Sequence, residues 1–143
     1  HLAAATSVVS GFDSRKDNLE VSSKPNALAL FNPALELSGR VEARRSVMGD
    51  FALEISPFHQ LLDSSVPTLI QHGIEDQTVP FSDAENYCRK LEQLEGECTL
   101  FGYEEAGHGF FNKGVNNNRW FPITLERLDE FLVQLDYIKA VEN

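Results

Sequence analysis

Two short apolar runs constrain the fold of this chain more than any other feature. Residues 27–31 read ALALF, between Pro25 and the pair Asn32-Pro33, and residues 67–71 read PTLIQ. Runs this short, bounded by chain-breaking residues, are typical of strands buried on both faces of a sheet. A sheet is covered on both faces when its strands are parallel and helices connect them.

Helical periodicity follows the second run. Apolar residues recur there every three or four positions, and Gly96 then supplies a helix stop. Ser82 and Glu85 have the spacing of a capping box, which predicts that the helix begins at Ser82. The apolar stripe of this helix is Ala84, Tyr87, Cys88, Leu91 and Leu94.

The remaining elements define the fold class. We expect a third strand at 97–103, helices at 2–10 and from about Ile123, and a short helix from Glu42 to Met48. Strand, helix, strand, helix is the pattern of an α/β fold with right-handed crossovers and a parallel sheet. We therefore predict about three parallel strands with flanking helices, in a single domain spanning residues 1–143. The stripe of the last helix is Leu128, Phe131, Leu132, Leu135 and Ile138.

Composition excludes several partners. The formal net charge of −10 comes from dispersed acids, so nucleic acid and anionic membrane would not attract this surface. No apolar run approaches the ~18 residues of a membrane span. No basic segment precedes an apolar one, so we expect no signal peptide in the chain as given, and the compartment stays open between cytoplasmic and exported.

The two cysteines leave two explanations open. Cys88 lies in a predicted helix and Cys98 at the start of the next strand, a spacing that fits no Cys-x-x-Cys redox or zinc motif. We favour two buried free thiols, because free cysteine is among the most buried residue types. A structural disulfide is the alternative, and it would imply an oxidising compartment.

Polar clusters follow two of the predicted strands. HGIEDQTVP occupies residues 72–80 and EEAGHGFF occupies residues 104–111. Ligands of open parallel sheets bind beyond the carboxyl ends of the strands, so Asp76 and His108 can meet there if the strands are neighbours. An acid beside a histidine fixes the imidazole tautomer and stabilises the imidazolium, which leaves the other ring nitrogen free to take a proton. We expect Gly107 and Gly109 to let the backbone bring His108 close.

Simpler roles compete with this one. A lone histidine is more often a surface or structural residue than a catalyst, and Asp76 also suits a turn. A metal site from Asp76, Glu105 and His108 has no His-x-x-x-His or equivalent pair behind it, so we expect no metal. The other candidates are expected to be solvated or structural: Glu75, Glu104 and Glu105 in the first group, His59 and His72 in the second.

Taken together, the two clusters resemble the C-terminal part of an α/β-hydrolase of the esterase/lipase group, which includes acetyl esterases and carbohydrate esterases. Asp76 in HGIEDQTVP matches the triad acid of that family, and His108 in EEAGHGFF matches the triad base. The opening HLAAAT resembles the helix after the nucleophile elbow in esterases that read Gly-x-Ser-x-Gly-Gly-His-Leu. The resemblance implies hydrolysis of a small-molecule carboxylic ester by a Ser-His-Asp mechanism, with no metal or organic cofactor.

The nucleophile departs from the family pattern. No Gly-x-Ser-x-Gly occurs in the sequence, and the matching serine would lie four residues before His1. The oxyanion-hole donors of the family would also lie upstream. Because a triad without its serine has no covalent route, we expect the 143-residue chain to be inactive by itself.

The resemblance also suggests a substrate pocket and partners. The segment between the first two strands contributes to a cap in related esterases, and aromatic side chains follow the base. With three strands of about eight, the first would have an open edge, so we expect self-association or pairing with a separate N-terminal portion. The pocket candidates are Met48, Phe51, Ile55, Phe58, Phe110 and Phe111.

Besides the esterase, two further candidates stay open: another hydrolase of the same fold, and a domain without catalytic activity. Serine peptidases of the prolyl oligopeptidase type and dienelactone hydrolases share this layout of acid and base. A non-catalytic α/β domain for binding or assembly is the third candidate, and it would hold Asp76 and His108 far apart.

Overall fold

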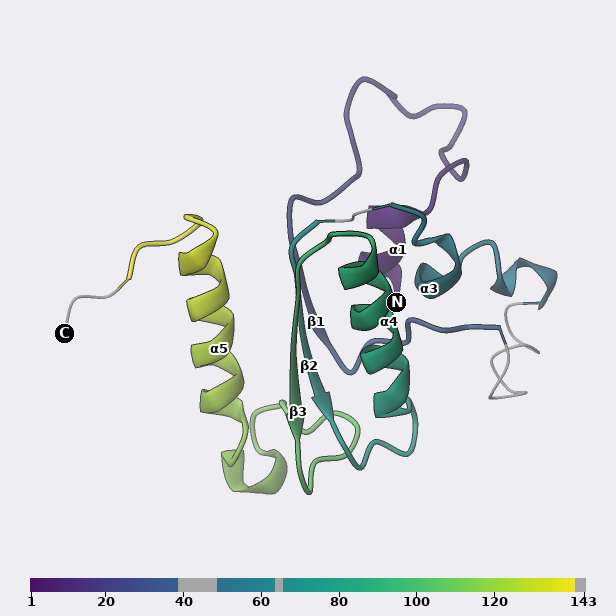
Figure 1. Ribbon diagram of the computed structural model, residues 1–143. Helices are drawn as coiled ribbons and strands as arrows, with labels where there is room; N and C mark the ends of the chain where they lie inside the picture. The colour runs from purple at the N-terminus through teal and green to yellow at the C-terminus, as the bar shows by residue number, and fades with distance from the viewer. Residues whose placement is uncertain (39–48, 64–65, 141–143) are drawn as a thin grey trace.

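The structure is a computed structural model that describes residues 1–38, 49–63 and 66–140 (Figure 1). The predicted helix from Glu42 to Met48, and Met48 as a pocket residue, lie outside the described residues. The helices are α1 (Leu2–Val8), α3 (Pro57–Gln60), α4 (Phe81–Gln93) and α5 (Phe121–Gln134). The strands are β1 (Leu28–Phe31), β2 (Thr68–Gly73) and β3 (Cys98–Tyr103), and two 3-10 turns are η1 (Gly49–Ala52) and η2 (Val115–Asn118).

The strands form one parallel sheet in the order β1-β2-β3, as the sequence predicts. Leu28 of β1 lies opposite Thr68 of β2, which in turn lies opposite Cys98 of β3. All three strands therefore run in one direction, and the loops after β2 and β3 emerge together at the lower edge of the sheet in Figure 1. Polar residues on these two loops consequently share one edge.

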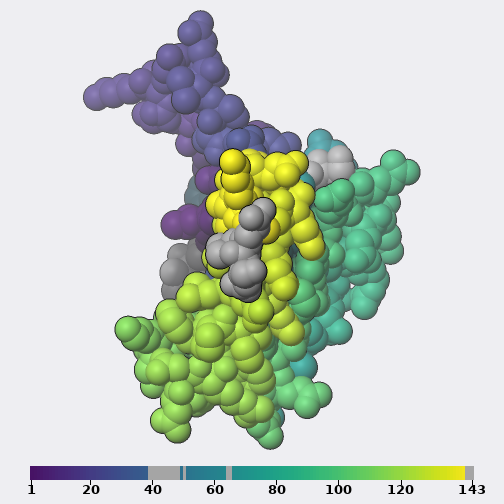
Figure 2. All heavy atoms as spheres, turned by 90° about the vertical axis from the view of Figure 1, so that its left-hand side faces the viewer, coloured from purple at the N-terminus to yellow at the C-terminus, as the bar shows by residue number. Residues whose placement is uncertain are grey.

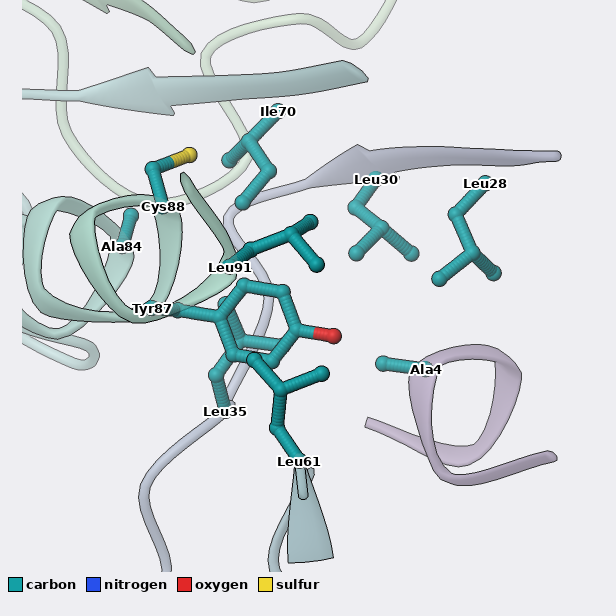
Figure 3. Close-up of a cluster of buried hydrophobic side chains, with 10 residues drawn as sticks. All are labelled: Ala4, Leu28, Leu30, Leu35, Leu61, Ile70, Ala84, Tyr87, Cys88 and Leu91. Atoms are coloured by element: carbon teal, nitrogen blue, oxygen red, sulfur yellow. The ribbon is translucent and has the colours of Figure 1, made fainter. Parts of the chain in front are cut away.

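Helices cover the sheet unevenly. Figure 1 shows α1, α3 and α4 on one side and α5 on the other. Because α4 carries its apolar residues on a single stripe and packs against β2 and β3, Tyr87 and Leu91 are fully buried. Figure 3 shows this cluster, in which Tyr87 and Leu91 point toward Leu30 and Leu61. Its buried members are Ala4, Leu28, Leu30, Leu35, Leu61, Ile70, Ala84, Tyr87, Cys88 and Leu91.

The opposite face is built around α5. In Figure 2 this helix and the segment that leads into it from β3 fill most of the visible surface. The Gln71 side chain on β2 donates to the backbone carbonyl of Thr124 at 2.9 Å, which fastens the helix to the central strand. Arg127 stacks over the Phe101 ring on β3, with 3.9 Å from the guanidinium carbon to the ring centroid. No helix within residues 1–38, 49–63 and 66–140 has the length and apolar character to cross a membrane.

Three local predictions were wrong. The first apolar run was predicted to be buried on both faces, as β2 is, but Ala29 of β1 is exposed. Strand β1 lies at the edge of the described sheet, and no described helix covers Ala29. Helix α4 begins at Phe81 after Pro80, so Ser82 lies inside the first turn and makes no capping bond. Helix α5 ends at Gln134, which leaves Ile138 beyond the helix and exposed.

The favoured assignment of the cysteines as free thiols was also wrong. Cys88 and Cys98 are joined by a disulfide, with 5.4 Å between their Cα atoms. The chain turns sharply after α4, so its last turns lie against the first residue of β3 at a separation that a disulfide can bridge. A disulfide joins helix to sheet at this end of the molecule.

Candidate active site

The loops that follow β2 and β3 are held together by their backbones. The Ile74 amide donates to the Tyr103 carbonyl at 2.9 Å, and the Glu75 amide donates to the Ala106 carbonyl at 3.0 Å. A Cβ atom at Gly73 would lie 2.2 Å from the Ala106 oxygen, so only glycine permits this approach. The two polar clusters therefore meet as the sequence predicts.

Asp76 and His108 are in direct contact. His108 Nδ1 lies 2.8 Å from Asp76 Oδ2. The Asp76 side chain is 0% exposed and the His108 side chain is 47% exposed. Because an ionised carboxylate only accepts, the Nδ1 atom carries the proton and donates it, which leaves Nε2 of the neutral ring as an acceptor. The half-exposed ring can therefore take a proton from a group that approaches from solvent.

The loop itself stabilises the carboxylate. Asp76 Oδ1 accepts from the Thr78 amide at 2.7 Å and from the Val79 amide at 2.9 Å. Burial acts to raise the pKa of Asp76, but the hydrogen bonds from Val79, His108 and Thr78 outweigh burial and lower the pKa below its usual value of 3.8. Asp76 is therefore an anion at neutral pH.

A third side chain, which the sequence did not single out, lies at the same place. Asn32 directly follows β1 and is 5% exposed. Its Nδ2 atom is 2.6 Å from Asp76 Oδ2 and 3.5 Å from His108 Nδ1. Sequence reasoning treated Asn32 only as the end of the strand. A polar residue at the carboxyl end of a predicted parallel strand was the signal available.

The glycines around His108 differ from the prediction in part. Gly109 adopts a φ of +76°, a left-handed conformation that other residues rarely take. Gly107 has no positive φ, and the nearest atom to a Cβ built there would be 3.9 Å away, so it does not require glycine. The freedom that positions His108 therefore comes from Gly109, and from Gly73 on the facing loop.

The predicted pocket residues that the structure describes do not form a single group. Phe51 is 58% exposed on η1, and Phe58 is partly buried against the core cluster that includes Tyr87 and Leu91. Ile55 lines a cavity of about 490 Å³ beside α1, and none of the lining residues comes from the loops that carry Asp76 and His108. Phe110 is buried against Tyr103, with 4.7 Å between ring centroids. Phe111 is half-buried and contacts Phe31, with 4.9 Å between ring centroids. Phe31 directly precedes Asn32, and Phe111 lies three residues after His108, so this aromatic pair joins the two segments in the chain.

The other candidates have structural partners. His59 Nδ1 lies 3.0 Å from Ser56 Oγ, and His72 is fully buried, where desolvation lowers its pKa. Glu105 pairs with Arg119 and does not join Asp76 and His108. Over the described ranges, no group of three or more His, Cys, Asp or Glu side chains is arranged to hold a metal ion.

Comparison with known proteins assigns the family. Residues 45–135 match the model of the prolyl oligopeptidase family. The chain belongs to this family. No curated protein sequence matches the chain significantly. The family model covers Asp76, His108 and the sheet edge that holds them.

Solved structures similar to this member of the prolyl oligopeptidase family include esterases. A thermophilic esterase of the Planctomycetes species Thermogutta terrifontis, with propionate bound, is 34% identical and has a TM-score of 0.89; the match covers 99% of this chain and 54% of that one. Esterase 2 of the same organism, phosphonylated by sarin, is 34% identical with a TM-score of 0.91, over 98% and 55% of the two chains. Its apo form is 35% identical with a TM-score of 0.91, over 98% and 53%.

These matches confirm the α/β-hydrolase fold class predicted from the sequence. The chain spans about half the length of the esterases it matches. Fold and family together place the chain among hydrolases, but they do not identify the type of bond that is cleaved.

Proposed function

We propose that this chain carries the acid and the base of a serine hydrolase that cleaves small-molecule carboxylic esters. The observation that carries the proposal is the 2.8 Å contact between buried Asp76 and half-exposed His108. In this mechanism Asp76 orients the imidazole, and His108 Nε2 accepts the proton of the attacking hydroxyl and then donates it to the leaving alcohol. The reaction needs no metal or organic cofactor.

The preference for an ester follows from the solved neighbours. Each structure described above is that of an esterase, and each superposes on almost all of this chain at a TM-score near 0.9. The arrangement of Asp76 and His108 supports the base but does not select the bond, because acyl transfer to water uses the same pair for esters and amides.

The nucleophile of the proposed reaction is a serine outside these 143 residues. The sequence holds no Gly-x-Ser-x-Gly, and no serine in the described part of the chain hydrogen-bonds to His108. We therefore expect the 143-residue chain alone to hydrolyse p-nitrophenyl acetate no faster than buffer does. Turnover by the chain that vanishes in a His108→Ala variant would contradict this placement of the nucleophile.

Substitution of the acid tests the proposed mechanism. In the gene product that contains this chain and the serine, Asp76→Asn keeps the size of the side chain but presents an amide to His108 Nδ1. The imidazole then loses its fixed tautomer, so we expect kcat to fall roughly 10³- to 10⁴-fold with little change in KM. A kcat within a few-fold of the parent would refute the role of Asp76.

The family match favours a second candidate, a peptidase. Residues 45–135 match a family named for prolyl oligopeptidase. Comparing kcat/KM for p-nitrophenyl acetate with that for a proline-containing peptide p-nitroanilide separates the two. The esterase proposal predicts the higher value for the ester, and a preference for the anilide would replace it with the peptidase.

A further inference from the structure

Asn32 connects three segments that the site depends on. Its backbone amide donates to the Gln71 carbonyl at 3.0 Å, which extends the pairing of β1 with β2 by one residue. Its side-chain Oδ1 accepts from the Gly73 amide at 3.2 Å at the end of β2. Its Nδ2 then reaches Asp76 on one loop and the Gly107 carbonyl, at 3.3 Å, on the other.

The chemistry of these partners fixes the orientation of the amide. The atom that faces Gly73 meets an N–H donor, so it must be the oxygen. The atom that faces Asp76 and Gly107 meets a carboxylate and a carbonyl, which only accept, so it must be the nitrogen. A flipped amide would oppose two acceptors with an oxygen and is therefore excluded.

The same carboxylate oxygen receives both the asparagine and the histidine. Asp76 Oδ2 accepts from Asn32 Nδ2 at 2.6 Å and from His108 Nδ1 at 2.8 Å. The two nitrogens are 3.5 Å apart, and both carry protons, so they meet through the oxygen and not with each other. With the Thr78 and Val79 amides on Oδ1, both oxygens of the carboxylate are held.

Asparagine at position 32 has two possible explanations: the left-handed backbone conformation of this residue, or the hydrogen bonds of its side-chain amide. Asn32 has a φ of +43°, in the left-handed region where asparagine is favoured among residues other than glycine. Glycine satisfies that backbone requirement without an amide side chain. Replacement by glycine therefore separates the two roles.

We propose that Asn32 is a positioning residue, whose amide holds the Asp76 carboxylate in the rotamer that receives His108 Nδ1. The catalytic consequence rests on the proposed function, whereas the arrangement of the three side chains does not. Without the amide, only His108 bonds to Asp76 Oδ2, while the Thr78 and Val79 amides still hold Oδ1. The carboxylate can then rotate about Oδ1, which moves Oδ2 away from His108 Nδ1.

The test measures the imidazole tautomer of His108 in the 143-residue chain. Long-range ¹H–¹⁵N NMR of the chain with ¹⁵N-labelled histidine reports which ring nitrogen carries the proton, at a pH where imidazoles are neutral. The signals of His108 are identified among those of the four histidines by their loss in a His108→Gln variant. We expect the parent chain to show a single Nδ1–H tautomer at His108, and Asn32→Gly to show the mixture typical of an unpaired ring.

Two further variants make the result specific. Asn32→Leu keeps about the size of the side chain but has no N–H donor, so it should lose the single tautomer as well. Asn117→Gly makes the same change at an exposed left-handed asparagine, with a φ of +54°, and should leave His108 unchanged. Thermal melting confirms that each variant is folded, and Asn32→Leu carries the test if Asn32→Gly is not folded.

An unchanged His108 tautomer in a folded Asn32→Gly or Asn32→Leu variant would overturn the inference, whatever reaction the protein catalyses. In the gene product with its serine, we expect Asn32→Gly to lower kcat roughly 10- to 100-fold with KM unchanged, because the base is misplaced. Loss of the tautomer without esterase activity in the parent would instead reject the proposed function and leave the positioning role standing.

Discussion

Among the residues that the structure describes, no lysine or arginine is bonded to the buried Asp76 carboxylate, and hydrogen-bond donors stabilise it instead. Four N–H groups point at its two oxygens, from Asn32, Thr78, Val79 and His108. Hydrogen bonds to an ionised group are worth more than those between neutral groups, and they also fix its direction. The carboxylate can therefore orient an imidazole while its own pKa stays low.

This arrangement predicts how stability depends on pH. The pKa of Asp76 is lowered on folding, so its contribution to stability is fully present above the unfolded value near 3.8 and is lost as pH falls through the folded value. At pH 7 we expect Asp76→Asn to lower the free energy of unfolding by about 1–3 kcal/mol, because the new amide opposes N–H donors. Urea denaturation should show this difference shrinking below about pH 4. A difference that is constant down to pH 2 would be inconsistent with a lowered pKa.

Glu95 provides a second test at a single residue. It follows the end of α4 with a φ of +61°, and the next residue, Gly96, donates its amide to the Leu91 carbonyl at 2.9 Å. A left-handed backbone costs a residue with a Cβ atom about 1–2 kcal/mol, which glycine avoids at some cost in chain entropy. We therefore expect Glu95→Gly to raise the free energy of unfolding by about 0.5–1 kcal/mol in urea titrations. A decrease would show that the Glu95 side chain makes a stabilising contact.

At the scale of elements, the periodic spacing of apolar residues predicted which segments form helices and strands. The strands and the helices α4 and α5 follow from apolar spacing, and the meeting of Asp76 with His108 follows from parallel strands that end at one edge. The start of α4 was missed because Pro80 and Phe81 define it without a side-chain cap. The disulfide was only the alternative to free thiols, and the contact of Asn32 with Asp76 was missed, because both depend on separations in space that spacing along the chain does not encode.

The disulfide between α4 and β3 predicts a measurable stabilisation. Cys88 and Cys98 are 10 residues apart, and closing a loop of this length stabilises a folded chain by about 3 kcal/mol in the chain-entropy model. Reduction with dithiothreitol should lower the melting temperature of the parent chain. The double variant Cys88→Ala with Cys98→Ala should melt near the reduced parent and be insensitive to reductant. Equal melting of the oxidised and reduced parent would contradict the stabilising role.

At the scale of the whole molecule, the sheet ends at β1. Within the described residues this strand is paired on one side only, and backbone groups along its other edge are available to another strand. The Leu28 and Asn32 amides point at β2, so the alternating Ala29 amide points at the open edge.

We expect the 143-residue chain to self-associate through this edge. Light scattering at high concentration should give a mass above that of the 16.0 kDa chain. Ala29→Pro removes an N–H from the open edge and spares the bonds to β2, so it should shift the population toward monomer. A clean monomer of the parent chain over the same concentrations would reject association through β1.

The central claim is that His108 is the base of a serine hydrolase, and its removal tests that claim most directly. The measurement is kcat/KM for p-nitrophenyl acetate in the gene product that contains this chain and the serine, compared between parent, His108→Ala and the control His59→Ala. His59 contacts Ser56 and is not bonded to Asp76. We predict a loss of roughly 10³-fold or more for His108→Ala and a change within a few-fold for His59→Ala. Hydrolysis by His108→Ala at a rate close to that of the parent would contradict the account.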